Sequence, residues 1–292
     1  ASTVTLQPIT RYGFDAAILF SDILMVPWAL QRNVRFKPNV GPLLDPMQSP
    51  KAIEQNLIND LRQKLAPVGE ALRLTKSNLS TETALIGFAG APWTVMTYMV
   101  EGGSSRDFAI TREWAWKYPK QVDALLGSLI ESTISFLSLQ ASAGADALML
   151  FDSWASAVPA AQRNWLVTQP ARLIIEELRK NGHKQPVIGF PKGIGEGLIT
   201  YVDQSGVDAV GLDHGVDPVW VDRNLPQNFP VQGNLDPLSL LQAGPEMFRD
   251  IDHILDAFAN RPHIFNLGHG ITPQTPTENV QLMLDHVRRH QG

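Results

Sequence analysis

Seven short apolar runs, spread along almost the whole chain, constrain the fold more than any other feature of the sequence. A strand with one solvated face alternates apolar with polar residues, and none of these runs does so. Each run is followed by a turn signal and then by a longer stretch. This pattern is typical of strands buried on both faces of a parallel sheet, and it predicts strands at residues 16–20, 84–88, 147–151, 186–190, 209–212, 230–233 and 263–267.

Longer segments with apolar residues at helical spacing fill the gaps between these runs. Pro119, Pro159 and Pro273 stand where helix starts tolerate proline. Strand, loop and helix repeat without an antiparallel block, an internal repeat or a linker-like stretch, which indicates consecutive βαβ units. The spacing predicts helices at residues 52–65, 122–139, 163–178, 238–258 and 277–287.

The number of strands limits the choice among α/β architectures. A closed TIM-type (β/α)8 barrel needs eight strands, whereas a doubly wound open sheet can have the seven that the sequence indicates. No strand is followed by the G-x-G-x-x-G loop of a dinucleotide-binding sheet, so the barrel is favoured over the open sheet. Because the chain starts at Ala1 and enters structured sequence almost at once, we expect a single barrel catalytic domain over residues 1–292, truncated at its N-terminus and lacking its first strand.

Composition argues against several classes of function. A formal net charge of −5 does not fit a nucleic-acid-binding footprint or a polybasic membrane patch. The chain has no cysteine, which excludes disulfides, thiolate metal sites and a cysteine nucleophile. Residues 87–100 form the longest nearly uncharged stretch, which is too short to span a bilayer. Neither H-E-x-x-H nor G-x-S-x-G is present, so we expect no metal site and no Ser-His-Asp triad.

The residues that follow the strands are the candidates for chemistry, because active sites of such barrels lie at the C-terminal ends of the strands. Asp22 follows the first run, Ser153 the third and His269 the seventh. Asp22 is equally typical of a helix cap, and Ser153 of an ordinary loop hydroxyl. His269 lies between two glycines, which allow a ligand to approach the backbone closely. Tyr98 is expected on a helix that leads into a glycine-rich loop, as a core residue or as a ligand-binding one.

Two further aspartates also follow apolar runs. Asp213 and Asp236 each precede glycine or proline within two residues, so we expect both to form turns. Residues 102–106 are rich in glycine and serine and leave a phosphate-binding role open, although they do not form a P-loop.

Six separate segments together carry a more specific signal than any single residue. They are T-L-Q-P at residues 5–8, F-S-D-I-L at 20–24, G-F-A-G-A-P-W-T at 87–94, Y-M-V-E-G-G-S-S at 98–105, Q-G-N-L-D-P at 232–237 and N-L-G-H-G at 266–270. In these segments, and in their order, the chain resembles the uroporphyrinogen decarboxylase family.

The resemblance implies a cytoplasmic homodimer built on a (β/α)8 barrel that works without metal or organic cofactor. The reaction it implies belongs to haem and tetrapyrrole biosynthesis: the four acetate side chains of uroporphyrinogen III lose carbon dioxide and become methyl groups, giving coproporphyrinogen III. By the same resemblance, Asp22 binds the pyrrole N–H groups at the centre of the macrocycle. Tyr98, Ser153 and His269 line the cleft, and Phe151 packs on the macrocycle.

The chemistry accounts for these residue types. Loss of carbon dioxide from a pyrrole-attached acetate needs an electron sink, which protonation of the ring carbon beside that substituent supplies. A fixed carboxylate in an apolar cleft, here Asp22, stabilises the resulting cation better than water does. Tyr98 and His269 are suited to hold substrate carboxylates or to position the reacting acetate.

The chain also departs from the family. The family's N-terminal segment, with its first strand and an R-Q-A-G-R loop whose arginines bind substrate carboxylates, has no counterpart here, and Lys192 and Arg106 are the obvious substitutes near the rim. Gln31 stands where a glycine usually follows Ala-Leu. Two alternatives are a corrinoid-dependent methyltransferase, which would hold zinc through His and Cys, and a tetrapyrrole-binding protein without catalytic activity.

Overall fold

A seven-stranded, all-parallel sheet forms the centre of the molecule in the computed structural model, which describes residues 1–37 and 41–290. Each strand pairs with its neighbours along the chain, so the sheet order follows the sequence order without the reversal of a doubly wound sheet. All seven predicted strands are confirmed. They are β1 (Ala16–Ile18), β4 (Ala84–Gly90), β5 (Ala147–Asp152), β6 (Val187–Pro191), β7 (Ala209–Gly211), β8 (Val231–Gln232) and β9 (His263–Ile264).

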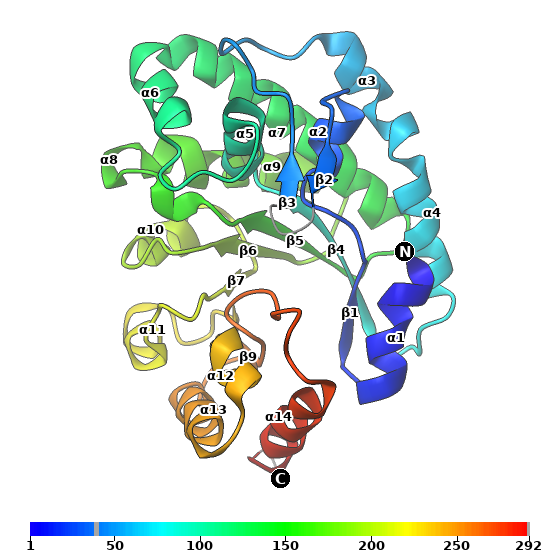
Figure 1. The fold of residues 1–292 in the computed structure, drawn as a ribbon, viewed down its shortest axis with the longest axis vertical. Helices are drawn as coiled ribbons and strands as arrows, with labels where there is room; N and C mark the ends of the chain where they lie inside the picture. The colour runs from blue at the N-terminus through cyan, green and yellow to red at the C-terminus, as the bar shows by residue number, and fades with distance from the viewer. Residues whose placement is uncertain (38–40, 291–292) are drawn as a thin grey trace.

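Helices cover the outer face of this curled sheet, as expected of a (β/α) barrel (Figure 1). The helices from α3 to α10 lie on one side of the sheet in Figure 1, and those from α11 to α14 lie on the other. In chain order they are α1 (Ser2–Tyr12), α2 (Met25–Ala29), α3 (Gln55–Lys64), α4 (Ala66–Lys76), α5 (Pro92–Glu101), α6 (Ala109–Lys117), α7 (Pro119–Ser142), η1 (Ala155–Ala157), α8 (Ala160–Arg163), η2 (Asn164–Thr168), α9 (Gln169–Lys180), α10 (Gly197–Gln204), α11 (Pro218–Asn224), α12 (Pro237–Gln242), α13 (Pro245–Ala257) and α14 (Thr277–His290).

The two faces of the sheet contribute to two separate cores. Alternate residues such as Leu85, Leu148 and Val187 are fully buried in the large core between sheet and helices. The residues between them point the other way, because side chains alternate along a strand. They form a small cluster inside the barrel, the interior cluster, made of Phe88, Met149, Ile188, Phe190 and Ala209 with Ile23, Ile86 and Phe151 at its edge.

The sheet ends at β1 on one side and at β9 on the other. Within residues 1–37 and 41–290 no strand pairs with their outer edges, and Ile18 and Ile264 are about half exposed there. The helices beside these strands do meet. Arg11 on α1 donates a hydrogen bond of 2.9 Å to the Thr277 hydroxyl on α14, and Arg288 donates one of 2.8 Å to the carbonyl of Gly13, which follows α1.

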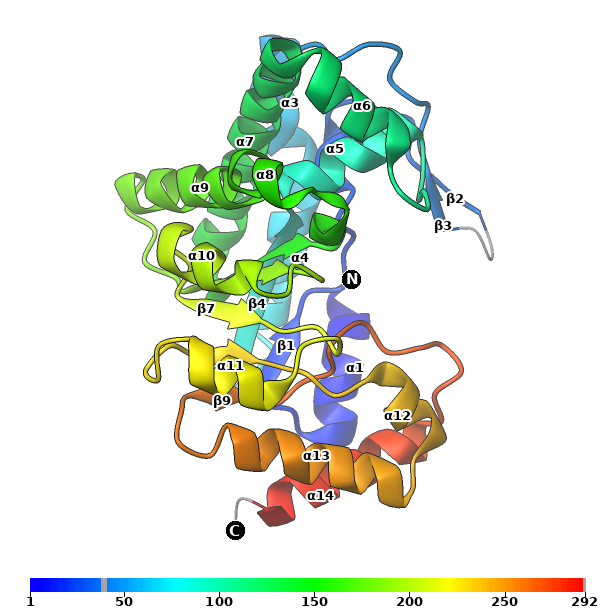
Figure 2. The same ribbon diagram turned by 90° about the vertical axis from the view of Figure 1, so that its left-hand side faces the viewer.

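The sequence predicted no antiparallel strands, and this prediction was wrong. Strands β2 (Arg35–Lys37) and β3 (Gly41–Leu43) form a two-stranded hairpin between α2 and α3 that projects from the body of the molecule (Figure 2). The segment after the hairpin is attached to the end of α5, where Leu44 donates a backbone hydrogen bond to Gly102 and Met47 donates one to Met99, both of 2.8 Å. This hairpin leaves only a weak pattern in the sequence, because each strand is three residues long.

The predicted helices are present, but two of them are interrupted at residues that explain the difference. The segment 238–258 is two helices, since α12 ends before Ala243 and Gly244, which both adopt positive φ, and α13 starts at Pro245. The segment 163–178 begins as the π-helical turn η2 before α9. Pro119 and Pro159 lie at helix starts as predicted, whereas Pro273 lies outside α14.

Helix α7 is the one described helix long and apolar enough to cross a membrane by length and composition. Of its most apolar window, 61% is buried inside the protein, where the helix packs against α9, α3 and β4. Its hydrophobicity is therefore that of a core helix in the barrel wall.

The backbone conformation of Gln31 is strained, and a substitution can test this. Gln31 directly follows Leu30, the C-cap of α2, and adopts a φ of 59°. A side chain makes this conformation costly, whereas glycine adopts it freely. We expect Gln31→Gly to raise the free energy of unfolding by about 0.5–1 kcal/mol, measured by chemical denaturation. Gln31→Ala removes the same polar group without relieving the φ and is the control. An unchanged or lower stability of the glycine variant would contradict this account.

Candidate active site

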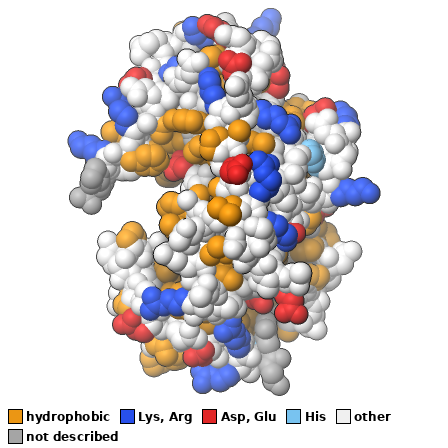
Figure 3. Space-filling view, turned by 90° about the vertical axis from the view of Figure 1, so that its right-hand side faces the viewer, with side chains coloured by type: hydrophobic (Ala, Val, Ile, Leu, Met, Phe, Trp, Pro, Cys, Tyr) orange, Lys and Arg blue, Asp and Glu red, His pale blue; other side chains and the backbone are white. Residues whose placement is uncertain are grey.

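The C-terminal ends of the strands open into a hollow beside the β2–β3 hairpin. The space-filling view shows this hollow as a notch in the outline of the molecule, with hydrophobic side chains gathered along one wall (Figure 3). Aromatic rings of the interior cluster lie near these strand ends. Phe151 lies edge-on to Phe88 with ring centroids 5.4 Å apart and to Phe190 at 5.8 Å, and the His269 ring is stacked on Phe190 at 6.3 Å. Two predicted site residues, Phe151 and His269, are thereby joined through Phe190, which the sequence did not single out.

Asp22 lies between β1 and α2, half-buried at the mouth of the barrel. Its Oδ1 accepts the N–H of Leu24 at 2.7 Å, which stabilises the turn before α2. The N-cap of α2 is Leu24 itself, so the helix-cap role weighed for Asp22 is not the one that the structure shows. Oδ2 has no hydrogen-bond partner in the part of the chain that the structure describes. Burial raises the pKa of Asp22, and the hydrogen bond from Leu24 opposes that rise. The carboxyl group thus combines a structural bond with a poorly solvated, unsatisfied oxygen.

Tyr98 lies on α5 and is buried close enough to Asp22 for the two groups to influence each other. Burial raises the pKa of Tyr98, the indole of Trp154 lowers it, and the negative charge of Asp22 raises it further. The Tyr98 and Trp154 rings lie 6.3 Å apart. Helix α5 ends at Gly102 with a φ of 79°, so the predicted helix leading into a glycine-rich loop is confirmed.

Ser153 follows β5 directly and is half-buried between two residues that are firmly held. Before it, Asp152 is 3% exposed and its Oδ1 accepts the hydroxyl of Thr94 at 2.6 Å. After it, the amide of Trp154 donates to the same Thr94 hydroxyl at 3.1 Å, and the Trp93 indole donates to the Trp154 carbonyl at 2.9 Å. These bonds fix the backbone of the turn that presents Ser153.

The Asp152 carboxyl is a buried titratable group beside the candidate site that sequence reasoning passed over. Burial raises its pKa to about 7, against the hydrogen bonding from Thr94 that lowers it. The sequence signal was available, since an acidic residue stands directly at the end of an apolar strand. It was not decisive, because Asp22, Asp213 and Asp236 occur in similar places.

The two aspartates expected to form turns do so. Asp213 is buried, and its carboxylate accepts the amides of Gly193 at 2.7 Å and Gly215 at 2.9 Å. Asp236 caps α12 by accepting the amide of Leu238 at 2.9 Å.

His269 is exposed at the rim and lies near Lys192, His214 and Asp213. Desolvation lowers its pKa most, the positive charges of Lys192 and His214 lower it further, and Asp213 raises it. An imidazole that stays neutral in this way is suited to donate or accept a hydrogen bond rather than to carry a permanent charge.

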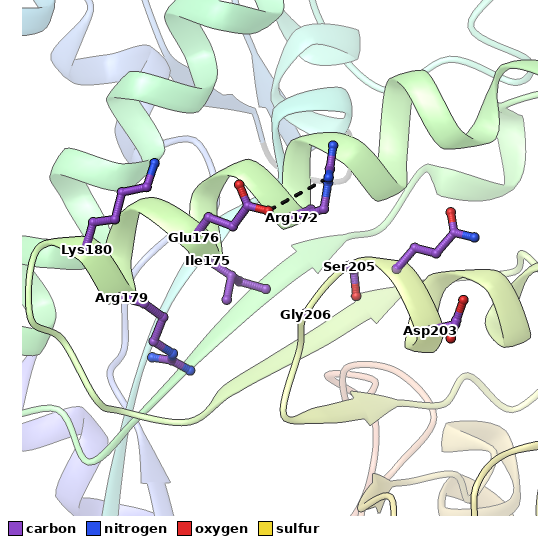
Figure 4. Close-up of a pocket in the computed structure, with 9 residues that line it drawn as sticks. Arg172, Ile175, Glu176, Arg179, Lys180, Asp203, Ser205 and Gly206 are labelled. Atoms are coloured by element: carbon purple, nitrogen blue, oxygen red, sulfur yellow. Dashed lines mark ion pairs between the residues drawn. The ribbon is translucent and has the colours of Figure 1, made fainter.

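The structure has two further hollows. One, of about 490 Å³, lies on the outer surface between α9 and α10, where Arg179 pairs with Asp208 and Arg172 with Glu176, so its cations are already partnered (Figure 4). The other is lined by Arg106, Trp154 and neighbouring residues. Within residues 1–37 and 41–290, His, Asp and Glu side chains do not gather in a group able to hold a metal ion.

The match to known proteins extends over the same strand ends and the whole of the barrel. A family model described as "Uroporphyrinogen decarboxylase (URO-D)" covers residues 1–290. The chain belongs to the uroporphyrinogen decarboxylase family. Within that family it is 49% identical over 289 residues to "Uroporphyrinogen decarboxylase" of Novosphingobium aromaticivorans and 48% identical over 288 residues to that of Rhodospirillum rubrum. These alignments cover 99% of this chain and 84% and 83% of the two relatives.

Solved structures extend the likeness of this uroporphyrinogen decarboxylase family member to more distant barrels. A methyltransferase from Methanosarcina mazei superposes with a TM-score of 0.84 at 17% identity, covering 100% of this chain and 85% of the other. A B12-independent methionine synthase from Shewanella follows with a TM-score of 0.62 at 11% identity, covering 99% and 84%. At such identities the likeness concerns the fold, and it supports the barrel over the open sheet.

The buried carboxyl of Asp152 predicts a pH-dependent stability. Above pH 4 this group is ionised in the unfolded chain but stays protonated in the folded chain up to about pH 7, so its contribution to stability falls as the pH rises through that window. Asp152→Asn removes the titration and keeps an oxygen for Thr94. We expect the free energy of unfolding of the variant, relative to the parent chain, to rise by roughly 2–3 kcal/mol between pH 5 and pH 8.

Denaturation at several pH values measures this difference. Asp60→Asn, on the exposed surface of α3, is the control for the substitution itself. A constant difference between the Asp152 variant and the parent chain from pH 5 to pH 8 would show that Asp152 does not titrate in this window.

Proposed function

We propose that this chain is a carboxy-lyase that decarboxylates the four acetate side chains of uroporphyrinogen III, giving coproporphyrinogen III in tetrapyrrole biosynthesis. Membership of the family and the hollow at the C-terminal ends of the strands support this reaction. The observation that carries it is the Asp22 carboxyl, which is half-buried, has one unsatisfied oxygen, and lies at the mouth of an aromatic barrel interior. A flat, hydrophobic macrocycle with polar N–H groups at its centre complements such a surface.

Asp22 is suited to a substrate that donates several hydrogen bonds and then becomes cationic. In the free protein the carboxyl is poorly solvated, as the direction of its pKa shift indicates. Pyrrole N–H groups that donate hydrogen bonds to Oδ2 would compensate for the poor solvation of the carboxyl group and favour its ionised form. A positive charge developing on the pyrrole ring would be stabilised further, and an interaction that strengthens in the transition state accelerates the reaction.

The proposed chemistry balances without a cofactor. A proton adds to the ring carbon next to the one that bears the acetate, which leaves a positive charge on the pyrrole. The bond between the acetate methylene and its carboxylate then breaks, its electron pair neutralises the ring, and carbon dioxide leaves. A second proton adds to the exocyclic methylene to form the methyl group, and the first proton departs from the ring carbon. We propose no metal and no organic cofactor for these steps.

The other predicted residues divide between polar positioning and apolar contact. Tyr98, whose ring is near Asp22 and Trp154, and Ser153 supply hydroxyls on one side of the hollow. His269 supplies an imidazole on the other side, stacked on Phe190. Phe151, at the edge of the interior cluster, offers its ring to the macrocycle. Orientation of the reacting acetate by these groups lowers the entropic part of the barrier.

The proposal also covers the oligomeric state, the binding partners and the location of the protein in the cell. We propose a homodimer that works in the cytoplasm on a small-molecule tetrapyrrole, without nucleic acid or membrane. The net charge of −5 supports the absence of nucleic acid, and the burial of α7 supports the absence of a membrane span.

The proposal predicts a selective effect of Asp22→Asn. Asparagine keeps an oxygen for the Leu24 amide, but it removes the negative charge that opposes the pyrrole cation. We expect kcat for uroporphyrinogen to fall about 100-fold or more, while the free energy of unfolding changes by less than about 1 kcal/mol. Turnover is measured by chromatography of the oxidised products, and stability by denaturation.

Asp236→Asn is the matched control, because Asp236 also follows a strand but caps α12. We expect it to change both stability and kcat little, because asparagine caps a helix about as well as aspartate does. Equal losses of activity and stability in the Asp22 variant would reduce Asp22 to a structural residue. Binding of the porphyrinogen by the parent chain without release of carbon dioxide would instead indicate a non-catalytic tetrapyrrole-binding protein.

A further inference from the structure

Three basic side chains come together at the rim, from loops that follow different strands. Lys192 comes directly after β6, His214 lies three residues beyond β7, and His269 follows β9. Lys192 is half-buried, whereas His214 and His269 are exposed. The two neighbours are close enough to His269 for their positive charges to act on its imidazole. We refer to these three residues as the rim cluster.

Backbone contacts hold the loops of the rim cluster together. The buried carboxylate of Asp213 accepts the amides of Gly193 and Gly215, so the residues that follow Lys192 and His214 are bound to one acceptor. The loop after β9 is equally close, since a methyl group at Gly268 would clash with the backbone of His214. The backbone positions of the three residues are therefore set by the barrel itself.

The positive charge of the rim cluster is that of the Lys192 ammonium group. Lys76, Lys117 and Lys180 each form a salt bridge with a carboxylate, but in the part of the chain that the structure describes Lys192 forms none. The Asp213 carboxylate, which acts on His269, accepts the amides of Gly193 and Gly215 and forms no salt bridge with Lys192 in the described residues. A lysine that is half-buried without a partner is expected to favour an added anion.

The cluster also faces the substrate hollow. The His269 ring is stacked on Phe190, and Phe190 belongs to the interior cluster beside Phe151. A macrocycle lying on Phe151 would extend its peripheral side chains toward the rim, where a carboxylate meets one ammonium and two imidazoles. Such charge-assisted hydrogen bonds are among the stronger polar interactions in proteins.

We propose that Lys192, His214 and His269 form a subsite that binds one peripheral carboxylate of the tetrapyrrole substrate. The inference rests on the proposed function and assigns Lys192 and His214 as specificity-determining residues. Neither is expected to take part in the bond-breaking steps. A subsite of this kind selects anionic macrocycles, because a substrate without a carboxylate leaves the half-buried lysine unpaired.

Lys192→Gln and His214→Gln test the subsite by equilibrium binding of uroporphyrin, followed by fluorescence, and by turnover of uroporphyrinogen. We expect Lys192→Gln to raise the Kd and KM about tenfold and His214→Gln to raise them roughly threefold, while kcat changes less than twofold. The octamethyl ester of uroporphyrin has no carboxylate charge, so its Kd is expected to be the same for the parent chain and both variants.

Lys184→Gln is the control for removal of a lysine charge, because Lys184 is exposed near the opposite end of β6. An unchanged Kd for uroporphyrin in both rim variants, or an equal change in Lys184→Gln, would overturn the subsite while leaving the proposed reaction in place. A parent chain that neither binds uroporphyrin nor decarboxylates uroporphyrinogen would overturn the proposed function. If His214→Gln fails to fold, Lys192→Gln still decides the matter.

Discussion

The site depends on the register of the parallel pairing among β4, β5 and β6. Phe151 pairs with Gly90 on one side and with Phe190 on the other, which directs the aromatic rings of the interior cluster to the inner face. A slip of one residue would turn those rings outward and bring the residues of the outer core inward, so burial on both faces fixes the register. The same register sets Asp152 opposite Pro191, and it thereby places the turns that carry Ser153 and Lys192 side by side.

The distribution of charge across the hollow follows from this geometry. A single carboxyl, Asp22, lies at the mouth with an unsatisfied oxygen, and basic groups lie at the rim. The other acidic groups nearby are engaged: Asp213 by two amides, Asp236 by a helix start, and Asp152 by Thr94. The net charge of −5 therefore says little about the local field that an anionic substrate would meet.

Helices and strands could be predicted where a pattern extends over many residues. They could not be predicted where a few residues decide the local conformation. All seven strands could be predicted, because strands buried on both faces lose polar alternation and their apolar runs stand out. The β2–β3 hairpin and the break at Ala243 and Gly244 could not, since three-residue strands and single backbone torsions leave weak patterns. Within the candidate site, Asp22, Tyr98, Ser153, Phe151 and His269 were named from strand ends and from resemblance. Thr94 and Asp152 were missed because their importance comes from a hydrogen bond between β5 and α5.

The strands shorten steadily toward the β9 end of the sheet. Pairing runs over five residues between β4 and β5 but over only two from β7 to β8 and from β8 to β9. Few interstrand hydrogen bonds therefore resist a rotation of the part that contains α11 to α14 against the part that contains α3 to α10. We expect the wall that carries His269 to yield more readily than the wall that carries Tyr98. Adjustment to substrates of different size, as acetates are lost in turn, would then take place by movement of the β9 side about a fixed β4–β6 platform.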